Sequence, residues 1–224
     1  MARIVLLRHA HSVANEKNLL AGRTPGIALS KSGREQALQL VNRIGSAYFD
    51  EIAISPIQRC RETIDPWLTS TNAHSRLVVD DSISEVDYGS WSGKSLASLR
   101  RKSQWKVVQE FPSQMIFPDG ESLLEMQGRA LSGFYRLNSV KGKGPRLLVS
   151  HGDVIKAIVA HCLGMHLDQF QRLVIEPASI TIIDTDQGMS RLVRFNDAKG
   201  FLSSPALDSS ANQSAIGGST GNLK

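Results

Sequence analysis

Residues 4–9, with the sequence Ile-Val-Leu-Leu-Arg-His, constrain the fold of this chain more than any other stretch. Four consecutive apolar residues that stop at charged ones are typical of a strand buried on both faces of a sheet. Arg8 and His9 would then follow the carboxyl end of that strand, at the edge where open α/β sheets hold their ligands. A guanidinium beside an imidazole at this edge indicates an anion pocket that contains a candidate nucleophile.

The rest of the chain alternates between strand and helix patterns. Short apolar runs predict strands at 51–55, 77–79, 146–150, 180–183 and 192–195. Apolar residues at helical spacing predict helices over 30–48, from 55 onward, and over 95–110, 121–139 and 152–163. The alternation favours an α/β fold with a mostly parallel sheet and helices on both faces, a three-layer α/β/α architecture. The last two strands should form a hairpin through residues 186–188.

Local signals refine the ends of three helices. Ser30 is a candidate N-cap for the first long helix. Ser55 and Pro56 have the pattern of an N-cap followed by proline at the first helical position. Pro66 should end or kink that second helix. Asp153 should cap the helix that starts at about residue 152 through its carboxylate.

Composition indicates one globular domain and a tail. The 224 residues are 41% hydrophobic and 21% charged, so a single core over residues 1–202 is expected. Residues 203–224 are rich in Ser, Gly, Ala and Asn, which predicts a disordered tail. The net charge of +5 indicates a mildly basic surface or a preference for anionic ligands. The sequence patterns of nucleic-acid-binding folds are absent, so nucleic acid is not expected as a partner.

The cysteines and the hydropathy pattern favour a cytoplasmic setting. Cys60 and Cys162 are too few for a disulfide framework or a zinc site, and both fall in helical patterns as buried thiols. No run of about 18 apolar residues predicts a membrane span. The apolar run before Arg8 is too short for a signal peptide. We therefore expect a reducing compartment and no membrane partner.

A second histidine, another arginine and a glutamate also fall at the ends of predicted elements. His151 follows a strand, Arg59 lies at a helix start, and Glu85 precedes a loop rich in Gly and Trp. Such a set suits phosphoryl transfer: an imidazole nitrogen attacks phosphorus, arginines neutralise the phosphoryl oxygens, and a carboxylic acid protonates the leaving oxygen. Guanidinium and imidazolium groups can supply the charge stabilisation without a metal. Each residue alone also fits an ordinary packed or salt-bridged role, and spacing cannot show that they converge.

Six segments carry these residues and their neighbours in a fixed order. They read Leu-Leu-Arg-His-Ala-His-Ser-Val-Ala-Asn at 6–15, Leu-Ser-Lys-Ser-Gly-Arg-Glu-Gln-Ala at 29–37, Ser-Pro-Ile-Gln-Arg-Cys-Arg-Glu-Thr at 55–63, Glu-Val-Asp-Tyr-Gly-Ser-Trp-Ser-Gly at 85–93, Gly-Glu-Ser at 120–122 and Ser-His-Gly at 150–152. The series resembles the motifs of the histidine phosphatase superfamily, in its phosphoglycerate mutase-like branch (branch 1). The resemblance spans residues 4 to about 165 and implies a phosphoglycerate mutase-like fold.

The resemblance implies a role for each matching residue. His9 would be the nucleophile that carries the phosphoryl group, and Glu85 would be the proton donor. Arg23 lies near a region that contacts substrate in the family. The residues that would bind the phosphoryl group are Arg8, Asn15, Arg59 and His151. Neither a metal ion nor a cofactor is implied.

Two positions depart from the commonest form of the first motif. Ala10 stands where glycine is usual, and His11 replaces a frequent Glu, Gln or Thr. His11 is either an extra phosphate ligand or, as the favoured alternative, a residue of the pocket rim or of the scaffold. Arg61 is a candidate second cation near Arg59.

Other charged and metal-ligating residues have simpler interpretations. The basic residues 100–102 could contact a second anionic group, although a solvated helix face is favoured. His161 and His166 are five residues apart across a helix end and do not share one face, which favours structural roles over a metal site.

The resemblance favours a phosphatase of the histidine acid phosphatase type that acts on a small phosphorylated metabolite through a phosphohistidine. A phosphomutase of the phosphoglycerate mutase type is the first alternative. Mutases of the branch usually have an additional stretch after the Trp loop, whereas only about thirty residues separate Gly93 from Glu121 here. A non-catalytic module that binds phosphorylated ligands is the second alternative, and the presence of every chemical residue argues against it.

Overall fold

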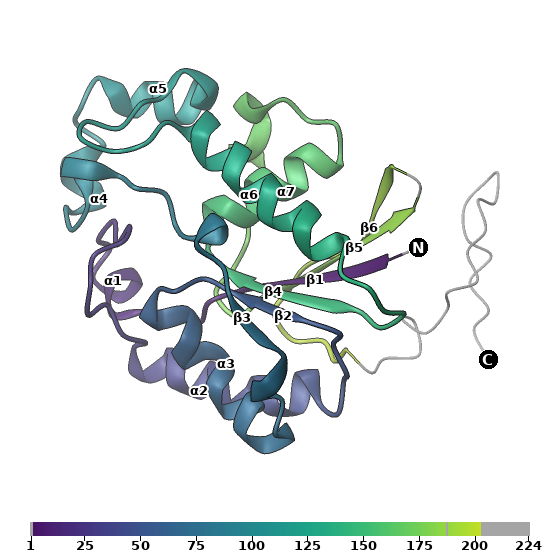
Figure 1. The fold of residues 1–224 in the computed structure, drawn as a ribbon. Coiled ribbons are helices and arrows are strands. Elements are labelled where there is room, and N and C mark those ends of the chain that lie inside the picture. The colour runs from purple at the N-terminus through teal and green to yellow at the C-terminus, as the bar shows by residue number, and fades with distance from the viewer. Residues whose placement is uncertain (1, 187, 203–224) are drawn as a thin grey trace.

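A computed structural model describes residues 2–186 and 188–202, which form a six-stranded mixed sheet covered by helices (Figure 1). The strand order is β3-β2-β4-β1-β5-β6. The strands span Ala2–Arg8 (β1), Ile52–Ile54 (β2), Leu77–Val79 (β3), Arg146–Ser150 (β4), Ile180–Asp186 (β5) and Met189–Asp197 (β6). The first four strands run parallel to one another. β5 pairs antiparallel with β1, and β6 pairs antiparallel with β5. The α/β class and the late hairpin are therefore confirmed.

Four long helices form the outer layers. They span Lys31–Ile44 (α2), Gln58–Thr71 (α3), Leu123–Asn138 (α6) and Gly152–Cys162 (α7). In Figure 1, α2 and α3 cover one face of the sheet, and α6 and α7 cover the other. Shorter helices span Val13–Glu16 (α1), Leu96–Leu99 (α4) and Gln104–Glu110 (α5), and single 3₁₀ turns span His74–Arg76, Asp81–Ile83, Gly89–Trp91, Pro112–Gln114 and Leu167–Arg172. The arrangement is the expected three-layer α/β/α architecture.

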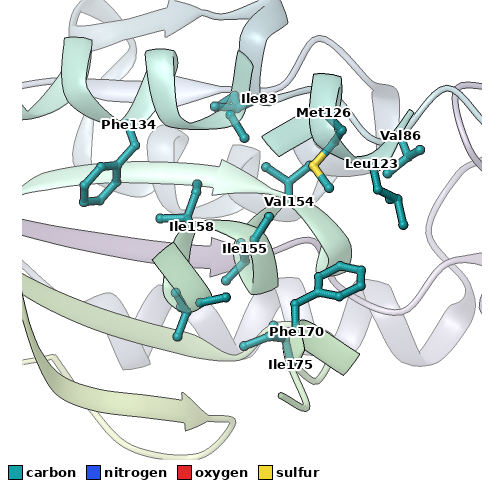
Figure 2. Packing of buried hydrophobic residues seen from close by; sticks show 14 of the residues in the cluster. Ile83, Val86, Leu123, Met126, Phe134, Val154, Ile155, Ile158, Phe170 and Ile175 are labelled. Atoms are coloured by element: carbon teal, nitrogen blue, oxygen red, sulfur yellow. The ribbon is translucent and has the colours of Figure 1, made fainter. Parts of the chain in front are cut away.

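The alternation of side chains along β1 builds both halves of the core. Val5 and Leu7 pack with α2 and α3, whereas Ile4 and Leu6 pack with α6 and α7. All four side chains are buried, as the uninterrupted apolar run predicts. Figure 2 shows the cluster that contains Ile4 and Leu6, in which apolar side chains of α6 and α7 pack against one another. β1 is thus held from both faces, and its carboxyl end is fixed in position.

The first long helix is shorter than its sequence pattern indicates. Ser30 is its N-cap, as predicted, and its hydroxyl accepts a hydrogen bond from the backbone of Gly33. The helix ends at Ile44 rather than near Tyr48, because Gly45 adopts a positive φ of 60°. The helical pattern over 95–110 is divided between α4 and α5.

The prediction that Ser55 and Pro56 begin the second helix is wrong, and of the two outcomes expected at Pro66 the ending of the helix does not occur. Helix α3 begins at Gln58 after Ile57, and the Ser55 hydroxyl hydrogen-bonds His151 instead of capping the helix. The helix also continues through Pro66 to Thr71. A proline inside a helix costs about 3 kcal/mol. Burial of the next two side chains, Trp67 and Leu68, contributes about 1.5–3 kcal/mol each and offsets that cost.

Two further expectations concern the ends of the chain and the membrane. Residues 203–224, for which a disordered tail is expected, lie outside the described residues. Over residues 2–186 and 188–202, no helix is long and apolar enough to cross a membrane.

Gly33 brings α2 against the segment that follows β1, which gives a test of the packing at this point. A Cβ atom at Gly33 would lie 1.9 Å from the carbonyl oxygen of His11, whereas one at Gly128 of α6 would meet nothing within 4 Å. We expect Gly33→Ala to lower the free energy of unfolding by about 2 kcal/mol or more. Gly128→Ala should raise it by about 0.5–1 kcal/mol, because alanine favours the helix. Denaturant unfolding of both variants measures this, and a stabilised Gly33→Ala would contradict the close approach.

Candidate active site

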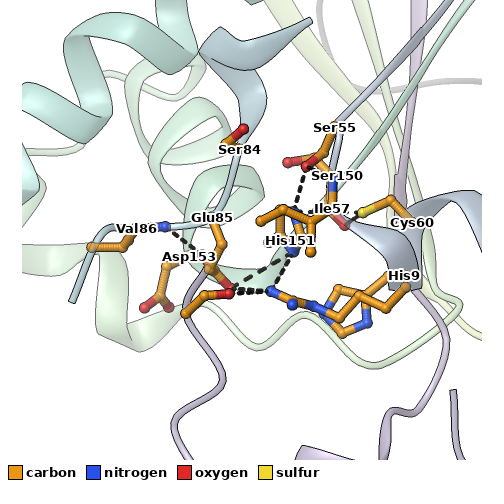
Figure 3. Close-up of polar contacts among 12 residues, drawn as sticks. His9, Ser55, Ile57, Cys60, Ser84, Glu85, Val86, Ser150, His151 and Asp153 are labelled. Atoms are coloured by element: carbon orange, nitrogen blue, oxygen red, sulfur yellow. Dashed lines mark hydrogen bonds and ion pairs between the residues drawn. The ribbon is translucent and has the colours of Figure 1, made fainter. Parts of the chain in front are cut away.

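The two histidines meet because their strands are parallel neighbours in the sheet. Arg8 of β1 pairs with Ser150 of β4, so the next residue of each strand reaches the same edge. The backbone N–H of His9 donates to the carbonyl of Ser150 at 2.9 Å, and the rings of His9 and His151 lie 5.2 Å apart between centroids. Figure 3 shows both rings on one side of a small polar space and Glu85 on the other.

The hydrogen bonds of His9 select one ring nitrogen as the nucleophile. Nδ1 lies 2.7 Å from the carbonyl oxygen of Ala10, which can only accept, so Nδ1 carries the proton. Nε2 therefore keeps its lone pair and receives a hydrogen bond from Nε of Arg59 at 3.1 Å. Burial, followed by the charges of Arg59 and Arg8, holds the pKa of His9 well below its ordinary value. The imidazole is neutral, as a nucleophile must be.

Arg8 and Arg59 each have a buried donor that no group within residues 2–186 and 188–202 accepts. Arg59 donates through Nη2 to the carbonyl of Gly22 at 2.9 Å and to Nδ1 of His151 at 3.0 Å. Arg8 donates through Nη1 to the carbonyl of Ile175 at 2.5 Å. Nε of Arg8 and Nη1 of Arg59 are buried without a partner. Buried donors without acceptors are costly, and two guanidinium groups that converge on one space call for an anion.

Glu85 lies opposite the histidines, and the backbone N–H of the next residue orients its carboxyl group. Its Oε2 is 3.9 Å from both Nη2 of Arg59 and Nδ1 of His151, and its Oε1 accepts from the backbone of Val86 at 3.0 Å. Burial, followed by the charge of Asp153, raises the pKa of Glu85 to about 7. The side chain is therefore a carboxylic acid over much of the acidic and neutral range and can donate a proton.

The other ring is oriented by a serine that the sequence pattern had placed elsewhere. Nδ1 of His151 accepts from Arg59, so the proton is on Nε2 and points to the hydroxyl of Ser55 at 2.8 Å. His151 is also the N-cap of α7, whose N-terminus adds positive potential to the site. Burial, with Arg59 and His9, holds the pKa of His151 well below its ordinary value.

A pocket of about 310 Å³ opens over these groups. Five of the predicted site residues line it: Arg8, His9, Asn15, Arg59 and Glu85. The amide oxygen of Asn15 accepts from the backbone and the hydroxyl of Ser12, which fixes the side chain at the pocket wall. The structure thus brings these residues together around one space next to His151.

Arg23 does not line this pocket, but it hydrogen-bonds the backbone of Glu85. Its Nε donates to the carbonyl of Glu85 at 2.8 Å, and its Nη2 pairs with Glu121 at 3.0 Å. Arg129, which sequence reasoning missed, donates to the same carbonyl at 3.0 Å and to Glu121. No sequence signal could have placed Arg129 here, since it lies mid-helix 44 residues from Glu85.

The expected cap by Asp153 is not formed, which corrects that prediction. No side chain caps α7, and the Asp153 carboxylate instead accepts from the hydroxyl of Tyr88 at 2.8 Å. The carboxylate faces the pocket, where Tyr88 pulls it away from the backbone N–H groups of the helix.

His11, Arg61 and His161 do not line the pocket. Nδ1 of His11 bonds the hydroxyl of Ser30 at 3.0 Å, and its backbone binds Gln36, so this residue ties the first motif to α2. Arg61 pairs with Asp65 at 2.5 Å on an exposed face of α3. His161 bonds the hydroxyl of Tyr135. Within residues 2–186 and 188–202, no three His, Cys, Asp or Glu side chains are grouped so as to hold a metal ion.

Comparisons with known proteins show which family model, sequences and fold this chain resembles. The family model of the histidine phosphatase superfamily (branch 1) matches residues 4–198. Phosphoserine phosphatase 1 of Hydrogenobacter thermophilus is 26% identical over 201 residues, which cover 88% of this chain and 92% of that protein. The 2,3-bisphosphoglycerate-dependent phosphoglycerate mutase of Cytophaga hutchinsonii is 26% identical over 88% of this chain and 89% of its own. A mycobacterial glucosyl-3-phosphoglycerate phosphatase has the same fold, with a TM-score of 0.79 at 23% identity over 88% of this chain and all of the other.

The raised pKa of Glu85 predicts a pH-dependent cost of burying its charge. The folded protein binds this proton more tightly than the unfolded chain does. The carboxyl group therefore favours folding below its ordinary pKa of 4.5, and the contribution is lost as pH rises through about 7. Glu85→Gln should match the parent near pH 4.5 and exceed its unfolding free energy at pH 8 by about 2–3 kcal/mol. A difference that does not change with pH in denaturant unfolding would contradict the buried acid.

Proposed function

The chain belongs to branch 1 of the histidine phosphatase superfamily, and from that premise we propose that it hydrolyses a phosphomonoester through a phosphohistidine on His9. Residues 1–202 would be the catalytic domain. One observation carries the proposal: Nε2 of His9, with its proton displaced to Nδ1, stands between two buried guanidinium groups that have unfilled donors. A phosphate dianion fills those donors and presents its phosphorus to the nucleophile.

In the first step, the lone pair of Nε2 attacks phosphorus and the bond to the ester oxygen breaks. Arg59 donates to Nε2 before substrate arrives, so its Nε turns to a phosphoryl oxygen when the N–P bond forms. Arg8 and Arg59 donate to the equatorial oxygens as charge develops, and His151 would join them when its Nδ1, which accepts from Arg59 before substrate binds, takes up a proton. Glu85 gives its proton to the leaving alkoxide. The carbonyl of Ala10 stabilises the positive charge that phosphorylation puts on the ring.

In the second step, the Glu85 carboxylate takes a proton from water, and the water oxygen attacks phosphorus. The N–P bond breaks, its electron pair returns to Nε2, and inorganic phosphate leaves. Glu85 thus regains its proton and alternates between acid and base. Its pKa of about 7 suits both directions of transfer near neutral pH.

The substrate is a small phosphorylated metabolite, since the pocket is about 310 Å³. The relatives that support a phosphatase are named for different substrates, phosphoserine in one and glucosyl-3-phosphoglycerate in another. Cys60 and Cys162 are free thiols, which supports a reducing compartment such as the cytoplasm.

A phosphomutase is the second candidate, because a mutase relative aligns over 88% of this chain and 89% of its own length. In a mutase, the phosphoryl group passes from His9 to a second hydroxyl instead of to water. Interconversion of 3- and 2-phosphoglycerate in the presence of 2,3-bisphosphoglycerate distinguishes the two reactions. We expect the rate of phosphate release to exceed the rate of interconversion. A faster interconversion would mean that the protein is a phosphomutase.

Removal of the nucleophile gives the first test of the mechanism. We expect His9→Ala to lower the turnover of an aryl phosphate at least about 10³-fold, because no other group can form the intermediate. His161→Ala removes a histidine that bonds Tyr135 on the outer side of α7 and should keep full activity. Phosphate release at mildly acidic pH, with the fold checked by circular dichroism, measures both. Turnover retained by folded His9→Ala would mean that another residue is the nucleophile.

The proton donor is tested by the leaving group. An alkoxide needs a proton as the ester bond breaks, whereas nitrophenolate leaves without one. Glu85→Gln should therefore reduce kcat for an alkyl phosphate by about 10²–10⁴, and reduce the first step on an aryl phosphate much less. Single-turnover release of nitrophenol and of an alkyl alcohol compares them, and equal losses would remove Glu85 from the role of acid.

A further inference from the structure

Beyond the phosphate site, the lining of the pocket contains both apolar and polar side chains. The apolar side chains are Leu19, Leu20, Leu96, Leu173 and Val174. Asp153 and Lys156 of α7 and Gln171 form a connected polar group in the lining, which we call the polar wall.

The polar wall holds one cation with donor capacity left over. Nζ of Lys156 lies 3.3 Å from Oδ1 of Asp153 and 3.2 Å from Oε1 of Gln171, and 5.6 Å from the centre of the Phe170 ring. An ammonium group has three N–H donors, and these two contacts use two of them. The Lys156 side chain is only 18% exposed, so its remaining donor acts in a partly desolvated space.

The same wall holds one anion with acceptor capacity left over. The hydroxyl of Tyr88 donates to Oδ2 of Asp153 at 2.8 Å, and this bond orients the carboxylate along the pocket. A carboxylate has about four acceptor sites, and Tyr88 and Lys156 fill two of them. Asp153 and Lys156 are thus opposite charges at i and i+3 on one helix, both turned toward the pocket.

This pair lies directly beside the phosphate-binding groups. Asp153 follows Gly152, whose missing Cβ would lie 3.3 Å from Nε of Arg8. One residue therefore separates the Arg8 guanidinium from the start of the polar wall. Asp153 and Lys156 line the same pocket as Arg8, so a group attached near the phosphate ester shares that pocket with them.

We propose that Asp153 and Lys156 form a subsite for the zwitterionic head of an α-amino acid whose side-chain hydroxyl carries the phosphate. The carboxylate of the substrate would pair with Lys156, and its ammonium group with Asp153. The proposal rests on the proposed function, since it names the substrate class of the same pocket.

Charge complementarity excludes the nearest alternatives. A substrate with a carboxylate alone would satisfy Lys156 but face the charge of Asp153, and one with an ammonium group alone would face Lys156. Like charges at this range are unfavourable in a partly desolvated space. Only a head with both charges fits both residues.

Three phosphates of similar size test the subsite. O-phospho-L-serine has both charges, phosphoethanolamine lacks the carboxylate, and 3-phosphoglycerate replaces the ammonium group with a hydroxyl. We expect kcat/KM for phosphoserine to exceed each of the others about tenfold or more, because each charge-assisted contact supplies at least that factor. The assay is run near pH 5.5, below the parent pKa of about 7 for Glu85, because Asp153 contributes to that raised pKa.

Matched variants assign each preference to its residue. Lys156→Met should bring the phosphoserine to phosphoethanolamine ratio close to one, and Asp153→Asn should do the same for the phosphoserine to 3-phosphoglycerate ratio. Ratios cancel any loss of chemistry that the two phosphates share. Lys106→Met removes a lysine of α5 that is 72% exposed and should leave both ratios unchanged.

An aryl phosphate separates this proposal from the proposed function. If the protein hydrolyses the aryl phosphate but shows neither preference, or keeps both preferences in the two variants, the subsite is wrong and the phosphatase stands. If the aryl phosphate is not hydrolysed, the proposed function fails. Calorimetric binding of the same three phosphates to the parent and to both variants then tests the subsite alone, and equal affinities would overturn it.

Discussion

The site depends on the burial of two guanidinium groups around one imidazole. Arg59 is only 1% exposed and lies in hydrogen-bond contact with both histidines. Such burial of like charges is costly unless carbonyls and an anion compensate it. The carbonyls of Gly22 and Ile175 compensate part of it, and the two unpartnered N–H groups leave the rest to a ligand. The protein therefore binds a phosphoryl group by completing its own hydrogen bonds.

The same burial sets the protonation states of the reacting groups. A low-dielectric environment disfavours charge of either sign, so it lowers the pKa of His9 and raises the pKa of Glu85. His9 is therefore a neutral nucleophile at the same pH at which Glu85 is a protonated acid. The neighbouring charges strengthen both effects, since Arg8 and Arg59 act on His9 and Asp153 acts on Glu85. One enclosed pocket thus provides both partners of a proton and phosphoryl transfer.

The sequence predicts those parts of the fold and site that depend on local pattern. The apolar run before Arg8 indicates a central strand, and its parallel pairing with β4 explains why two strand-end histidines meet. The role of Ser55 could not be read from its neighbours, because Ser-Pro is a local helix-start signal while the contact with His151 spans 96 residues. Pro66 does not end helix α3 for a similar reason, because the packing of distant side chains decides whether the helix continues. Local signals fail where a long-range contact competes for the same group.

The isomer of the phosphohistidine tests the central claim most directly. The carbonyl of Ala10 keeps the proton of His9 on Nδ1, so phosphorylation must occur on Nε2. Rapid alkaline quenching during turnover, followed by peptide mass spectrometry and ³¹P NMR, locates the phosphate and distinguishes the two ring nitrogens. We predict a single phosphorylated peptide that contains His9, with phosphate on Nε2. Phosphate on Nδ1 or on His151, or turnover without any phosphohistidine, would contradict the account.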